Sequence, residues 1–166
     1  IFSIANQVYR GLQSILSPLI LALIPYMARN KDVRLFMRLF KFIMFLIIIK
    51  MLTLIVLLNF FNYHLLESLP GFENYFTLFL FTFILYAGNA FMGYPFLSNL
   101  GHAETANRSA LFGAMVYIAF NGILFTVNEL SVITIILSVM LSEFFIFYIR
   151  LHKTIKLVAL NEKILE

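Results

Sequence analysis

The chain has 166 residues, of which 62% are hydrophobic and only 12% are charged, with a formal net charge of +4 and no cysteine. A soluble domain carries about 25% charged residues, so a chain with half that share cannot cover its surface with polar groups. The absence of cysteine excludes a disulfide framework and thiolate metal sites. The composition therefore predicts an integral membrane protein.

Five segments are long enough to cross a hydrocarbon core, which needs about 20 residues of helix. We expect helices at 2–28, 35–61, 75–97, 106–127 and 131–149, and a tail at 150–166. No extended period-two pattern, repeat or linker competes with them. The fold class predicted is an all-α membrane protein, a single transmembrane bundle over 1–166. The chain begins with Ile1 rather than Met, and no basic region precedes its first apolar run, so we expect no signal peptide and a start within a longer protein.

Basic residues are distributed unevenly among the connections between these spans. The second and fourth connections contain no Lys or Arg and instead carry Glu67, Glu73 and Glu129. The first and third connections, with the span ends beside them, and the tail hold ten basic residues: Arg29, Lys31, Arg34, Arg38, Lys41, Arg108, Arg150, Lys153, Lys156 and Lys163. The positive-inside rule then predicts a cytoplasmic first connection and a cytoplasmic C-terminus. The net positive charge therefore needs no nucleic-acid partner.

The first span carries a polar stripe on an otherwise apolar helix. At about 3.6 residues per turn, one face collects Asn6, Arg10, Gln13 and Ser17, flanked by Ser3, Gln7 and Ser14. The other side collects Ile4, Val8, Leu12, Ile15 and Leu19. Lipid offers polar groups no partners, so such a face must meet protein or a water-filled cavity.

Apart from the basic residues counted with the connections and the tail, three charges lie inside the predicted spans: Arg10, Lys50 and Glu143. Each costs roughly 2.5–3.5 kcal/mol at mid-bilayer on insertion scales, so each requires a reason. Lys50 either lines an aqueous cavity or forms an ion pair within the bundle. Arg10 either faces the same cavity or reaches the outer interface. Glu143 either protonates in a coupling step or acts as a structural partner for Lys50 or Arg10.

Small residues indicate where helices touch, because they let backbones approach closely in lipid. The third span has Ala87, Gly88, Ala90 and Gly93, and the fourth has Ala106, Ala110, Ala114 and Gly113. Asn89 and Asn121 lie on or beside these faces, where we expect hydrogen bonds to a neighbouring helix.

The sequence contains no grouping that is typical of catalysis or metal binding. His, Asp and Glu residues do not cluster at metal-ligand spacing, and neither a Ser-His-Asp set nor a Gly-rich phosphate loop appears. We therefore expect no enzyme activity, no metal and no cofactor. Two cations in the membrane and a polar stripe predict a bundle that accommodates an anion, such as a transporter.

Three runs of the chain resemble Wzx-type polysaccharide flippases of the multidrug/oligosaccharidyl-lipid/polysaccharide exporter superfamily. They are Ala5-Asn-Gln-Val-Tyr-Arg-Gly-Leu-Gln-Ser-Ile-Leu-Ser-Pro-Leu19, which continues into Ile24-Pro-Tyr-Met-Ala-Arg29, then Gly93-Tyr-Pro-Phe-Leu-Ser-Asn-Leu-Gly-His-Ala-Glu-Thr-Ala-Asn107, and Leu141-Ser-Glu-Phe-Phe-Ile-Phe-Tyr-Ile-Arg150. The resemblance extends over essentially the whole chain. It rests on the order and spacing of these runs, since none of them is diagnostic alone.

The resemblance implies a twelve-helix protein with two six-helix lobes, of which this chain is similar to the eighth through twelfth helices. It implies transport of undecaprenyl-pyrophosphate-linked oligosaccharide across the bacterial inner membrane by alternating access. The implied partners are this lipid-linked substrate, the bilayer, the N-terminal lobe of the same protein and other polysaccharide assembly proteins. Arg10 and Lys50 would then neutralise the pyrophosphate, and Asn6, Gln7 and Gln13 would bind sugar hydroxyls, with Ser17 also lining the cavity.

Three alternatives remain open at this stage. A multidrug or cation antiporter of the same superfamily would carry several intramembrane acids, whereas this chain has one. A membrane polysaccharide polymerase would have large external loops. A small binding subunit that captures a vitamin would form a complete bundle with its own N-terminus.

Overall fold

The computed structural model describes residues 2–65 and 72–165, and these residues form only helices and short turns. The elements are α1 (Phe2–Asn30), α2 (Val33–Leu65), α3 (Phe72–Phe91), the π-helix η1 (Met92–Ser98), α4 (Ala103–Thr126) and α5 (Val132–Leu165). Five helical stretches are long and apolar enough to cross a membrane, which confirms the predicted all-α membrane fold. The chain is a multi-pass membrane protein. Part of the predicted second connection, with Glu67, and the last residue of the predicted tail, Glu166, lie outside the described residues.

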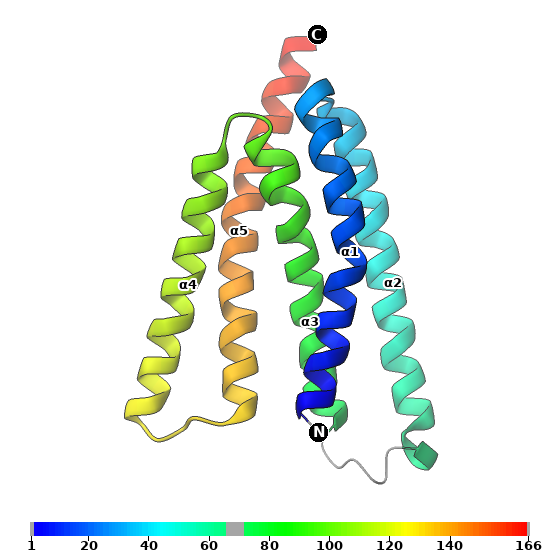
Figure 1. The fold of residues 1–166 in the computed structure, drawn as a ribbon, viewed down its shortest axis with the longest axis vertical. Coiled ribbons are helices and arrows are strands. Elements are labelled where there is room, and N and C mark those ends of the chain that lie inside the picture. The colour runs from blue at the N-terminus through cyan, green and yellow to red at the C-terminus, as the bar shows by residue number, and fades with distance from the viewer. Residues whose placement is uncertain (1, 66–71, 166) are drawn as a thin grey trace.

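The central helix of the bundle is α3, which contacts α1, α2 and α5 (Figure 1). Most of its apolar segment is buried inside the protein, whereas the other four helices are mostly exposed. On the far side, α4 packs against α5 and η1. The bundle is therefore an open arrangement around one enclosed helix, and its outer faces are left to lipid or to other protein.

The turns place alternate ends of the helices on the same side. Figure 1 shows the α1–α2 turn, the η1–α4 turn and the C-terminal end of α5 at one end of the bundle, and the N-terminus and the α4–α5 turn at the other. The first turn is closed by Lys31, which has a positive φ of 50° and donates its backbone N–H to Met27 O at 3.0 Å. Asp32 then caps α2, because its Oδ1 accepts the N–H of Leu35 at 2.9 Å.

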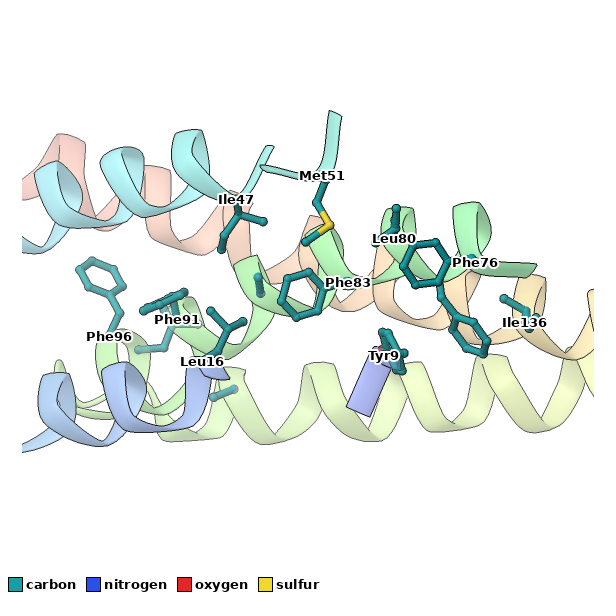
Figure 2. Close-up of a cluster of buried hydrophobic side chains, with 14 of the residues drawn as sticks. Tyr9, Leu16, Ile47, Met51, Phe76, Leu80, Phe83, Phe91, Phe96 and Ile136 are labelled. Carbon is teal, nitrogen blue, oxygen red and sulfur yellow. The ribbon is translucent and has the colours of Figure 1, made fainter. Parts of the chain in front are cut away.

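Aromatic side chains fill the space around α3. Figure 2 shows Phe83 of α3 between Leu16 of α1 and the pair Ile47 and Met51 of α2. The ring of Tyr9 stacks on Phe79 with centroids 5.0 Å apart. These apolar contacts hold α1 and α2 on α3.

A π-helix, η1, replaces the last turns of the span predicted at 75–97. Pro95 lies inside it and lacks the N–H that would bond the carbonyl of Phe91, while the proline ring clashes with that same carbonyl. Gly93 absorbs the distortion with a ψ of −107°, which is not helical. Asn99 then ties this end to α1, since its amide donates to Ile24 O at 3.1 Å.

The face of α4 that meets α5 differs from the predicted one. Ala110 and Ala114 are exposed, and the buried face consists of Ala106, Ser109 and Gly113. The buried residues are spaced by three and then four, which keeps them on one face of a helix with 3.6 residues per turn. Residues spaced by four throughout, as Ala106, Ala110 and Ala114 are, move progressively around the helix and leave that face. The expected small-residue face is thus confirmed at Ala106 and Gly113 but not at Ala110 or Ala114.

Candidate functional site

A cluster of polar side chains joins α3, α4 and α5 inside the membrane-spanning region. We call it the polar core, and it consists of Asn89, Ser109, Glu143 and Arg150. Asn89 and Ser109 are almost fully buried, with 3% and 1% of their surface exposed. Such groups are costly in an apolar interior unless they are hydrogen-bonded, and each of these four forms hydrogen bonds with another element.

Arg150 supplies most of these bonds. Its Nε donates to Ser109 Oγ at 2.8 Å, its Nη1 to Asn89 O at 2.7 Å, and its Nη2 to Ala106 O at 2.9 Å. One guanidinium from α5 thereby connects α3 and α4. The planar fork of an arginine suits three acceptors in this arrangement, which a lysine ammonium would not reach together.

The local sequence leaves room for this guanidinium. A Cβ added at Gly93 would lie 2.7 Å from Nη1 of Arg150 and 3.3 Å from its Cζ. Ala106 and Ser109 of α4 are also small, so a long side chain from α5 fits between η1 and α4. The sequence analysis assigned Arg150 to the tail after the fifth span; in the structure α5 continues through Arg150 to Leu165, and the Arg150 side chain turns into the bundle.

Glu143 interacts with Asn89 rather than with the cations expected for it. Asn89 Nδ2 donates to the Glu143 carboxylate at 2.6 Å and to the Glu143 backbone O at 2.9 Å. Across residues 2–65 and 72–165, no ion pair joins Glu143 to Lys50 or Arg10. Asn89 therefore connects the carboxylate of Glu143, through its side-chain Nδ2, with the guanidinium of Arg150, through its backbone carbonyl.

The predicted hydrogen bonds from Asn89 and Asn121 to a neighbouring helix are confirmed. Asn89 reaches Glu143, and Asn121 Nδ2 of α4 donates to Ser138 Oγ of α5 at 2.8 Å. Both bonds end on α5. Asn89 therefore connects α5 to α3, and Asn121 connects α5 to α4 at another position along the helix.

The polar stripe of α1 divides into two parts in the structure. Arg10, Gln7 and Ser17 are exposed, whereas Asn6 and Gln13 are half-buried. Tyr9, which neighbours this inner edge on α1, is buried and stacks on Phe79 of α3. The inner edge of the stripe thus borders the contact between α1 and α3, and its outer edge faces away from the described helices.

Lys50 belongs to α2 and lies next to a different side of α1 from the one that carries Arg10. It lines a groove of about 230 Å³ between α1 and α2, with Phe83 of α3 also contributing. The α1 residues of this groove are Leu12, Ile15, Leu16 and Leu19, which belong to the apolar side of the helix. The structure therefore does not bring Lys50 and Arg10 to one face, and their roles toward a substrate stay predictions.

Sequence reasoning missed Arg150, although one signal was present. Arg150 follows Glu143 by seven residues, so the two charges share a face of α5 two turns apart. A carboxylate that lies on the same helical face as an arginine indicates that the face is not lipid-exposed. The polar core can hold two opposite charges inside the bundle without an ion pair between them.

Replacing Asn89 by Ala is expected to lower the free energy of unfolding by about 1–3 kcal/mol, because the Glu143 carboxylate then loses its donor. Unfolding in mixed detergent micelles, followed by circular dichroism, measures this change. Asn121→Ala is the matched control, and we expect a smaller loss because its partner Ser138 is an uncharged hydroxyl. Equal losses for the two variants would contradict a charged network at Asn89.

Comparison of the chain with protein-family models, with curated proteins and with solved structures finds no match.

Proposed function

We propose that this chain is part of a flippase that moves undecaprenyl-pyrophosphate-linked oligosaccharide across the bacterial inner membrane by alternating access. The observation that carries the proposal is the exposed outer edge of the α1 stripe. Gln7, Arg10 and Ser17 are exposed on a helix that is apolar enough to cross a membrane. Since lipid cannot satisfy these groups, this edge requires water or another protein segment beside it.

The open arrangement of the bundle supports a cavity at this edge. α1 is held on α3 by its other residues, among them Ala5, Tyr9 and Leu16, which are buried. A second lobe placed opposite α1 would enclose the stripe and leave a polar lumen between the lobes. In that lumen, Arg10 would face the pyrophosphate, and Asn6 and Gln13 would bind sugar hydroxyls.

The resemblance to Wzx-type flippases supplies the class of ligand. A pyrophosphate with attached sugars combines negative charge with many hydroxyls, and the stripe combines one guanidinium with amides and hydroxyls. The contact between α1 and α3 adds a fixed scaffold behind the stripe, because Tyr9 is buried and stacks on Phe79. The C-terminal end of α5 would face the cytoplasm, in keeping with the basic residues at that end.

The test replaces Arg10 in the gene that encodes this chain and scores surface polysaccharide in a flippase-deleted host. We expect Arg10→Ala to lower export by about tenfold or more at normal protein level, and Arg10→Lys to retain part of it, because the lost contact is charge-assisted. Lys50→Ala is the matched control, since it removes an equal charge from the opposite side of α1. We expect it to reduce export less.

Two results would contradict the proposal. Normal export by the Arg10→Ala variant would show that the stripe does not serve a substrate. A loss of export that follows only from loss of the protein from the membrane would show that Arg10 is structural. Purified protein in vesicles, tested for transport of the lipid-linked oligosaccharide, distinguishes a flippase from an antiporter.

A further inference from the structure

A basic groove lies apart from the α1 stripe, between the first turns of α2 and the last turns of α5. Its volume is about 390 Å³. It is lined by three cations of α2, by apolar side chains of both helices and by one amide: Arg34, Arg38, Lys41, Val33, Met37, Val158 and Asn161. We call it the basic groove. None of these residues was among the substrate-binding candidates.

The three cations of the groove share one face of α2, since they follow one another at spacings of four and three. All three are exposed. Like charges so close together repel one another and favour an anion between them. Among the side chains that the structure describes, the ion pair found is Arg108–Glu104 on α4, and none of their carboxylates pairs with the groove. Asp32 is near in sequence, but its Oδ1 is engaged with the backbone of Leu35.

The groove lies where the lipid-facing surface of α2 begins. The apolar run of α2 starts directly after Lys41, and Phe42 and Phe45 are 59% and 60% exposed. Phospholipid headgroups lie at this level, at the end of a membrane-spanning helix. A bound anion would thus have its charge beside the cations and its apolar part beside Phe42 and Phe45.

The geometry points to a binding site for the phosphate headgroup of an anionic phospholipid in the basic groove. Charge alone would also accept free phosphate, but three of the seven lining residues, Val33, Met37 and Val158, are apolar, which suits an amphiphile. Basic pockets between membrane helices bind anionic headgroups by this combination. The inference goes beyond the proposed flippase function and does not depend on it, because it uses neither Arg10 nor the polar core.

The test measures lipid binding by the purified chain in a neutral detergent, using native mass spectrometry and thermal unfolding. Short-chain phosphatidylglycerol is the probe, with phosphatidylcholine of the same chain length and inorganic phosphate as the other arms. We expect phosphatidylglycerol to bind about tenfold or more tightly than phosphatidylcholine, and phosphate to have no effect at the same concentration. Raising the salt concentration should reduce the preference, since the contact is ionic.

Variants locate the site. The triple variant R34Q/R38Q/K41Q should lose the preference for phosphatidylglycerol, and R34K/R38K/K41R should keep it. The matched control R29Q/R108Q/K156Q removes the same charge from exposed positions outside the groove and should also keep the preference. The inference is overturned if the groove variant retains the preference, if the control loses it equally, or if inorganic phosphate competes as well as the lipid. If the groove variant fails to fold, Arg38→Gln alone decides, and we expect a partial loss.

Discussion

Replacing Arg150 by Met is expected to lower the free energy of unfolding by about 2–5 kcal/mol, the largest effect of any single exchange of a charged residue in this chain. The guanidinium donates to Ser109 Oγ, Asn89 O and Ala106 O, so its removal leaves three acceptors on two helices without this donor. Methionine retains the apolar stem of arginine and lacks the guanidinium, so the loss reflects mainly the hydrogen bonds of that group. Unfolding of the purified protein by SDS in mixed micelles, followed by circular dichroism, measures the difference.

Two further variants complete this experiment. Arg150→Lys keeps the charge but cannot reach all three acceptors, so we expect an intermediate loss. Arg108→Met is the matched control, because Arg108 pairs with Glu104 at an exposed position and its removal should cost under about 0.5 kcal/mol. If Arg150→Met and Arg108→Met lower the free energy of unfolding by the same amount, the polar core does not hold α3, α4 and α5 together.

Replacing Gly113 by Ala is expected to lower the free energy of unfolding by about 1–3 kcal/mol through overpacking between α4 and α5. A Cβ at this position would lie 2.5 Å from both Cδ1 and Cγ1 of Ile146 and 3.0 Å from Ser142 Oγ. It would also disturb the hydrogen bond from Ser142 Oγ to Gly113 O, which is 2.8 Å long. The same unfolding assay in mixed micelles reports the change.

Gly122→Ala is the matched control on the same helix, because a Cβ there meets no atom within 4 Å. Alanine is a better helix former than glycine, so this exchange should raise the free energy of unfolding by about 0.5–1 kcal/mol. In the background of Ile146→Ala, the cost of Gly113→Ala should shrink, since the clashing atoms are gone. Two alanine variants of equal stability would show that α4 and α5 do not approach closely at Gly113.

Much of the fold could be predicted because it depends on local properties of the chain. The five spans follow from apolar length alone, and the two turns at Lys31 and Asn128 fall at breaks in hydropathy. Asn89 and Asn121 were expected to bond across helices because a polar side chain in lipid needs a protein partner. The candidate substrate residues were predicted from the α1 stripe in the same way, and their role stays a prediction.

The sequence by itself determined that the chain has five segments long and apolar enough to cross a membrane, and that α1 carries a polar face. These properties depend on residue type and helical period, which are independent of the neighbouring helices. Only the tertiary structure decided that Glu143 meets Asn89, that Lys50 and Arg10 lie on different sides of α1, and that Arg150 turns inward. The reason is that a long charged side chain goes where the small residues of other helices leave it space and acceptors. Gly93 and Ser109 provide both for Arg150, and they lie 57 and 41 positions away in the sequence.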